Sequence, residues 1–185
     1  MKVFIAGARS ITTVDSFVIH KLRSICDKHF DVLIGDCYGV DTAVQSFFAN
    51  CAYPQVTVYA SNGKPRNNVG RWITKDVQVT SSARGFEFFR QKDIAMANDA
   101  DIGFMIWDGE SRGTLHNIIT LAEQKKTVLV YIPKRQTPLA IRSLDEAEKL
   151  VPLCGETAMR EYCKLLKNKA ASFHAAPEQL SMLSH

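Results

Sequence analysis

Residues 101–114 read Asp-Ile-Gly-Phe-Met-Ile-Trp-Asp-Gly-Glu-Ser-Arg-Gly-Thr, and this stretch decides the fold class. Its first half is an apolar run of the kind that forms a β-strand buried on both faces, which is typical of a parallel sheet. The run ends in a polar turn with Gly109 and Gly113, and apolar residues at helical spacing follow through Ala122. A buried strand that passes through such a turn into a helix predicts part of a βαβ unit.

The same pattern recurs on both sides of this stretch. Strands are predicted at residues 3–7, 31–35, 56–60, 101–107 and 127–132, with helical periodicity between them. Right-handed crossovers leave few ways to order such strands. We therefore predict an α/β fold of Rossmann-like type: a doubly wound, mainly parallel five-stranded sheet flanked by helices. Residues 61–71 are turn-forming and basic and predict a loop.

Length and composition limit the possible classes of protein. With 185 residues, 46% of them hydrophobic, one domain over residues 1–167 is expected, followed by a small polar tail at 168–185 that we predict to be flexible. No apolar run approaches the roughly 18 residues of a membrane span, so we expect a cytoplasmic protein without a membrane partner. The five cysteines lack metal-ligand spacing, which argues against a disulfide framework or a metal site.

In open parallel sheets, ligands bind beyond the carboxyl ends of the strands. Three turns of this sequence reach that edge, at residues 7–10, 35–41 and 107–114. In the first, Gly7 allows the backbone to approach a ligand, and Arg9 offers a forked donor for phosphate or carboxylate. An ordinary turn with a surface arginine is the alternative.

The turn at residues 107–114 carries the sharpest signal. Its backbone N–H groups, the hydroxyls of Ser111 and Thr114, and the dipole of the following helix together predict a phosphate cradle. A helix that is merely capped, with Thr114 in its first turn, is the alternative.

The turn at residues 35–41 adds a second set of candidates. Asp36 has no evident local role and can accept hydrogen bonds from a ribose or a base, whereas Asp41 suits a helix N-cap. The basic loop could close over an anion, with Trp72 stacking on a base; a solvated excursion is the alternative. The predicted ligand-binding residues are Gly7, Arg9, Ser10, Gly35, Asp36, Gly39, Trp72, Ser111, Arg112, Gly113 and Thr114.

Three motifs together resemble the SLOG superfamily, which includes the LOG phosphoribohydrolases and the DNA-processing protein DprA. They are the Gly-Val-Asp segment at 35–41, the helix at 92–96 followed by Ala100-Asp101, and the Gly-Thr turn at 111–114. The similarity runs from Val3 to about Tyr131. It implies a Rossmann-like fold that holds a nucleotide phosphate at the Gly-Thr turn, and a cytoplasmic oligomer, most simply a symmetric dimer.

The sequence departs from the enzymes of this superfamily at the catalytic position. LOG enzymes and nucleoside deoxyribosyltransferases have an essential glutamate in the first helical turn after the Gly-Thr turn, where this chain has Leu115, His116 and Asn117. Asparagine is neither a nucleophile nor a general base, and the arginine of the LOG enzymes falls on Lys92. If a bond is cleaved, the candidate catalytic residues are Asp36, Lys92, Asp93 and Glu110.

We predict, from these observations, binding of a nucleotide or nucleotide-derived small molecule without a cofactor or a metal. A nucleotide N-glycosidase with a relocated carboxylate is the alternative, since a carboxylate beside the ribose stabilises an oxocarbenium-like state. DprA-like nucleic-acid binding requires a basic stripe. The net charge is only +4, and the basic clusters at 64–75 and 164–169 lie far apart in sequence. We therefore do not expect nucleic acid as a partner.

Overall fold

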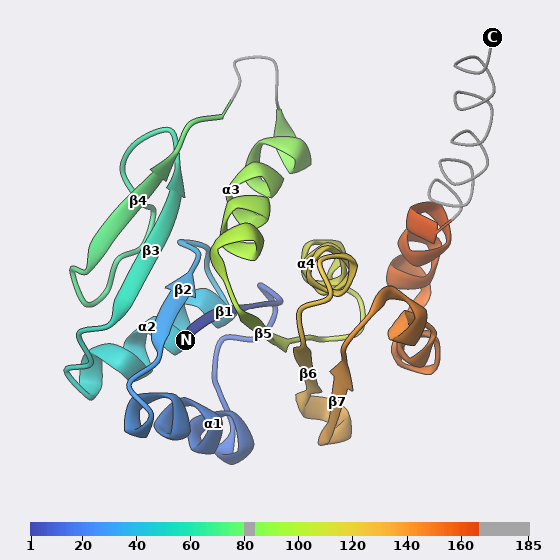
Figure 1. The fold of residues 1–185 in the computed structure, drawn as a ribbon, viewed down its shortest axis with the longest axis horizontal. Helices are drawn as coiled ribbons and strands as arrows, with labels where there is room; N and C mark the ends of the chain where they lie inside the picture. The colour runs from blue at the N-terminus through green and yellow to red at the C-terminus, as the bar shows by residue number, and fades with distance from the viewer. Residues whose placement is uncertain (80–83, 167–185) are drawn as a thin grey trace, which may run out of the picture.

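The computed structural model describes residues 1–79 and 84–166. A single sheet with the strand order β4-β3-β2-β1-β5-β6-β7 runs through them (Figure 1). Its strands are β1 Lys2–Gly7, β2 Asp31–Ile34, β3 Val56–Ser61, β4 Ile73–Val77, β5 Ile102–Ile106, β6 Val128–Ile132 and β7 Thr137–Ile141. All neighbouring strands are parallel except β6 and β7, which are antiparallel. The predicted tail at 168–185 lies outside the described residues.

The helices connect these strands and cover both faces of the sheet, as a doubly wound fold requires. They are α1 Ser16–Asp27, α2 Val40–Asn50, α3 Gly85–Asp99 and α4 Arg112–Glu123, followed by the 3-10 helices η1 Pro133–Arg135 and η2 Leu144–Leu153. Residues 156–166 are also helical. In the described part of the chain, no helix is long and apolar enough to cross a membrane.

The prediction of α/β class is confirmed, but the predicted count of five strands is wrong because the sheet has seven. Both missed strands lie at its edges. β4 has Lys75 and Asp76 at its centre, and β7 contains Pro138, so neither shows the apolar run of a buried strand. Edge strands tolerate charges and proline because one side of the backbone needs no partner.

Two apolar cores lie on opposite faces of the sheet. Val18 and Leu22 of α1 and Val44 of α2 pack on one face, and Met96 of α3 and Leu115 of α4 pack on the other. The chain moves outward from the central β1 to β4, then returns through α3 to β5 on the other side of β1. The strand order therefore reverses between β1 and β5, which is where open α/β sheets form their ligand crevices.

Candidate functional site

A cavity of about 530 Å³ lies at this reversal point, beyond the carboxyl ends of β1 and β5. This volume is in the range of small-molecule sites. Its walls come from the turn after β1, the start of α2, the side of α3 and the start of α4. The polar and aromatic residues that line it are Arg9, Ser10, Cys37, Asp41, Phe86, Phe89, Arg90, Lys92, Asp93, Asp108, Ser111, Arg112, Thr114 and Asn117.

The N-terminus of α4 faces this cavity without a side-chain cap. Ser111 occupies the N-cap position and makes no capping hydrogen bond from its side chain. The first N–H groups of a helix have no intrahelical partner, so those of Arg112, Gly113 and Thr114 are available to an anion. A Cβ at Gly113 would have no neighbour within 4 Å, so there is open space beside the first turn of α4.

Asp108 shapes the turn that leads into α4. Its carboxylate accepts the Ser10 hydroxyl at 2.6 Å and the N–H groups of Glu110 at 2.9 Å and Ser111 at 2.7 Å. Although burial favours its neutral form, these hydrogen bonds hold the pKa of Asp108 below its ordinary value. The Ser10 hydroxyl, predicted to bind ligand, therefore donates to Asp108 at the wall of the cavity.

Two arginines of the wall stack on aromatic rings. The Arg9 guanidinium lies 5.9 Å from the centroid of Phe89, and that of Arg112 lies 5.4 Å from the centroid of Phe86. Neither arginine forms an ion pair with a carboxylate of residues 1–79 or 84–166. Stacking on a ring holds a guanidinium in place while its N–H groups stay free to donate.

The floor of the cavity holds a buried group of charges. Lys92 is only 2% exposed, and its Nζ donates to Oδ1 of Asp93 at 2.7 Å. Burial opposes the charge of Lys92, but Asp93 and Asp41 raise its pKa above the ordinary value, so the ammonium stays charged. Burial raises the pKa of Asp41 to about 7, although the Lys92 charge acts in the opposite direction.

The raised pKa of Asp41 predicts a measurable pH dependence of stability. Between an unfolded pKa near 4 and a folded pKa of about 7, the folded state binds more protons, so raising the pH across this window lowers the free energy of unfolding. Relative to Asp41→Asn, which cannot titrate there, the wild type should lose on the order of 3–4 kcal/mol from pH 4 to pH 8. Urea unfolding of both proteins across this range measures the difference. If the free energies of unfolding of the wild type and Asp41→Asn changed in parallel with pH, the raised pKa would be contradicted. The exposed Asp27→Asn is the control.

Asn117 completes the floor, and sequence reasoning noted it only as a departure from enzymes. It lies one helical turn after Thr114, is 7% exposed and lines the cavity. Its amide has no hydrogen-bond partner among the residues that the structure describes. Its position three residues after the predicted phosphate-binding Thr114, and thus on the same face of the helix, is the signal that could have identified it.

Asp36 is occupied within the protein. Arg66 donates to its carboxylate through Nη2 at 2.7 Å and Nε at 3.0 Å, and the Arg66 N–H adds a third bond at 3.0 Å. Burial acts against its charge, but these bonds from Arg66 hold the pKa of Asp36 below its ordinary value. Asp36 does not line the cavity. These bonds tie Asp36 to the basic loop, and its predicted contact with ligand or role in catalysis stays a prediction.

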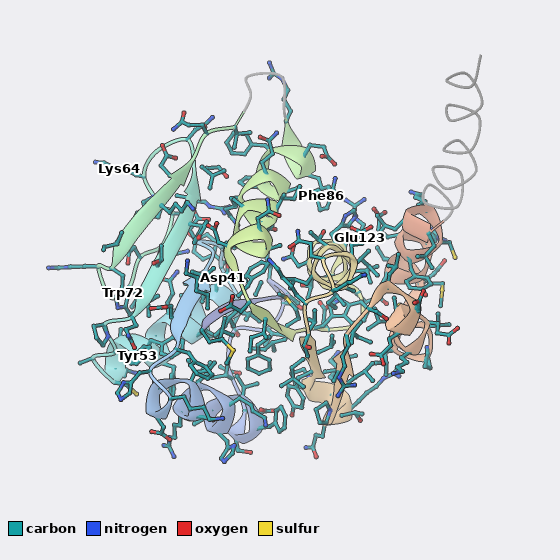
Figure 2. All side chains as sticks on the ribbon, in the orientation of Figure 1. Asp41, Tyr53, Lys64, Trp72, Phe86 and Glu123 are labelled. Atoms are coloured by element: carbon teal, nitrogen blue, oxygen red, sulfur yellow. The ribbon has the colours of Figure 1, made fainter. Side chains whose placement is uncertain are left out.

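Trp72 and Glu110 also lie away from the cavity. Trp72 lines a separate hollow, and its indole N–H donates to the carbonyl of Tyr53 at 2.8 Å. In Figure 2, Trp72 and Tyr53 lie apart from Phe86. Glu110 accepts the N–H of Thr157 at 3.1 Å and is absent from the cavity wall. The structure therefore does not bring Trp72 and Glu110 to this cavity, and their expected roles in stacking and catalysis stay predictions.

The predicted glycines act through close backbone approach. Gly7 lines the cavity, and a Cβ there would come within 2.2 Å of the Ile106 carbonyl oxygen. Gly39 has a φ of +82° and lies against the backbone of Arg9. Gly35 lies beside the Asp41 carboxylate. Gly35 and Gly39 therefore support the floor and the turn without lining the cavity themselves.

Chemically, the cavity suits an anion better than a metal ion. Among the described residues no group of three His, Cys, Asp or Glu side chains could hold a metal. The basic groups lie at the mouth and at the start of α4, whereas the carboxylates are engaged by Lys92 or by the donors to Asp108. Of the four predicted catalytic residues, only Lys92 and Asp93 line the cavity.

Comparison with known proteins shows which solved structure this fold resembles. No family model matches the chain, and no curated protein matches it. A solved structure of DNA processing protein A from Helicobacter pylori, described for its single-stranded DNA binding mode, matches with a TM-score of 0.55 at 14% identity. The match covers 91% of this chain and 81% of that one. The chain has a DprA-like fold.

This DprA-like fold corrects the expectation about nucleic acid. A protein of the same fold is described as binding single-stranded DNA, so excluding nucleic acid was wrong. The sequence argument counted net charge and looked for basic residues that are neighbours in sequence. The fold instead brings Arg9, Arg66 and Arg112, from three distant segments, onto Phe89 and Phe86.

Proposed function

We propose that the cavity binds a nucleotide of single-stranded nucleic acid, with a phosphate at the N-terminus of α4 and a base against Phe86 or Phe89. The observation that carries the proposal is the pair of unpaired, ring-stacked arginines, Arg9 and Arg112, beside an uncapped helix end. The proposal keeps the site that was predicted to bind a nucleotide. The nucleotide is now part of a nucleic-acid strand and not a free small molecule.

The phosphate position follows from the available donors. N–H groups at the start of α4 and two guanidinium forks converge on the same cavity. Charge-assisted hydrogen bonds of this kind are the usual way in which proteins hold phosphate. Asp108, with three donors of its own, positions the turn and competes little for them.

The base position follows from the rings. Proteins that bind single strands combine a basic surface with aromatic side chains, because every base has a face that can stack. Phe86 and Phe89 lie on α3, both line the cavity, and arginines flank them. The single-stranded DNA binding for which the DprA-like neighbour is described supports this assignment.

The test is a titration of a fluorescently labelled 20-nucleotide single strand, followed by anisotropy at several salt concentrations. We expect tighter binding of the single strand than of the duplex, and a log–log salt slope of about −0.7 for each phosphate contacted. Competition by nucleoside monophosphates measures how far one nucleotide suffices. Absence of binding to any strand at low salt would contradict the proposal.

Removing one ring should weaken stacking selectively. Phe89→Leu is expected to lower the affinity for the single strand about tenfold, because stacking on one aromatic side chain contributes about 1–3 kcal/mol per base. The neighbouring Phe88→Leu is the matched control, since Phe88 is not part of the cavity wall. Equal affinities of the two variants would rule out Phe89 as a stacking platform.

A nucleotide N-glycosidase is the second candidate. It is favoured by the carboxylates of Asp41 and Asp93, which line the same cavity on either side of Lys92. A carboxylate beside a ribose can stabilise the developing oxocarbenium ion. Incubating the protein with nucleoside monophosphates and measuring free base tests it. Tight binding without base release would leave binding as the sole function of this cavity.

A further inference from the structure

We infer that the cavity recognises a terminal phosphomonoester, so that the protein binds the end of a strand rather than an internal segment. This inference rests on the proposed function and specifies its ligand. Three observations carry it: the buried floor of the cavity, the two guanidiniums without ion pairs at its wall, and the unpartnered amide of Asn117.

The floor of the cavity is buried. It is formed by Lys92 and Thr114, each 2% exposed, and by Asp41 at 6% and Asn117 at 7%. Ala6 and Gly7, at the end of the central strand, line the cavity as well. A strand end brings only one backbone segment to this buried floor, whereas an internal phosphate would bring two.

The charge at the mouth matches a dianion. Arg9 and Arg112 have no ion-pair partner in the described chain, so both guanidinium forks can donate to a ligand. A terminal phosphate carries about −1.5 to −2 near pH 7 and presents three acceptor oxygens, whereas an internal diester carries one charge and has two free oxygens. Two arginine forks and the N–H groups of α4 provide donors for three oxygens.

The carboxylates of the wall have partners other than Arg9 and Arg112. Asp93 is paired with Lys92, and Asp108 accepts three hydrogen bonds. Asp41 lies beside the same ammonium, and burial raises its pKa to about 7, so it is partly protonated near neutral pH. The N–H groups of the Arg9 and Arg112 guanidiniums therefore remain free to donate to a ligand.

Two groups in the cavity wall have no hydrogen-bond partner in the described chain, and a ligand could supply one to each. The Asn117 amide is nine-tenths buried in the floor and has no partner in the described chain. The Nε of Arg90, on the opposite wall, is also buried without a hydrogen bond to any described residue. Burying a donor such as the Arg90 Nε without a partner costs about 1–3 kcal/mol. Oxygens of a terminal phosphate or of its sugar, held between α3 and α4, would satisfy both.

The test compares one 20-nucleotide DNA in four forms: 5′-phosphorylated, 3′-phosphorylated, hydroxyl-ended and circular. We expect one phosphorylated form to bind at least tenfold tighter than the hydroxyl-ended form, and the circle to bind no tighter than the latter. Equal binding of all four forms would overturn end recognition and leave the proposed function standing. Absence of binding by every form would overturn both.

A variant tests the position of the phosphate independently. Asn117→Asp keeps the size of the side chain and adds a negative charge at the floor, so it should reduce the preference for the phosphorylated form to less than threefold. Its affinity for the circle should fall by a smaller factor than its affinity for the phosphorylated form, and its melting temperature shows whether the variant is folded. The exposed Asn50→Asp on α2 is the matched control. A preference that survives intact in Asn117→Asp would overturn the placement of the phosphate.

Discussion

Replacing Arg9 and Arg112 together by glutamine is expected to lower the affinity for single-stranded oligonucleotides about a hundredfold. Each guanidinium is free of ion pairs within the described chain and can form charge-assisted hydrogen bonds of about 1.5–3 kcal/mol. A combined loss of about 3 kcal/mol corresponds to a factor of about one hundred. The salt slope should become shallower by about 1.4, because two phosphate contacts are lost. Anisotropy titrations measure both quantities.

The matched control for this variant removes the same net charge elsewhere. Arg23→Gln/Lys134→Gln changes two exposed residues, on α1 and η1, that do not line the cavity. Their loss should change affinity less than threefold. Because Arg9 and Arg112 are themselves exposed, neither double variant should shift the melting temperature by more than a few degrees. Equal loss of affinity in both would mean that net charge, not this cavity, attracts the strand.

Lys92→Met is expected to lower the free energy of unfolding by about 3–5 kcal/mol at pH 8, the largest stability effect predicted for this protein. Lys92 is buried at the floor, and its removal leaves Asp93 and the buried Asp41 without a compensating cation. Breaking a buried pair by removing one partner has this magnitude. At pH 5 the loss should be smaller, because the stranded carboxyls take up protons. Urea unfolding at both pH values measures it.

A double variant distinguishes charge from packing as the cause. Lys92→Met/Asp93→Asn removes both members of the ion pair and should regain a large part of the lost stability. If the double variant is as unstable as Lys92→Met and shows no pH dependence, the effect of Lys92 comes from the packing of its aliphatic chain. The exposed Lys28→Met controls for the added hydrophobic side chain.

The interior of the sheet could be predicted from the sequence, but its margins could not. Residues 101–114 form the predicted strand, turn and helix because an apolar strand in the middle of a parallel sheet is buried on both faces. β4 and β7 were not predicted because they lack an apolar run. An edge strand can contain charged residues, such as Lys75 and Asp76 of β4, or a proline, such as Pro138 of β7, and still pair with its neighbour. Local sequence says nothing about which strand will stand at an edge.

Some residues of the candidate site could likewise be predicted from the sequence, and others could not. Arg9 and residues 111–114 were predicted because they follow strands, and strand ends share one edge of a parallel sheet. Phe86, Phe89 and Asn117 lie on helix faces, and which face of a helix meets a crevice depends on how the helix packs. The ion pair of Asp36 could not be predicted because its partner Arg66 lies 30 residues further along the chain.

The central position of β1 has a consequence for synthesis of the protein. β1 is made first, yet it pairs on one side with β5, which ends at Ile106. At about 5–20 residues per second, the ribosome needs some 5–20 seconds to deliver that partner. During this interval the nascent chain carries an apolar strand with an open hydrogen-bonding edge, a known template for aggregation. Expression conditions that slow elongation between β4 and β5 should therefore reduce the soluble yield.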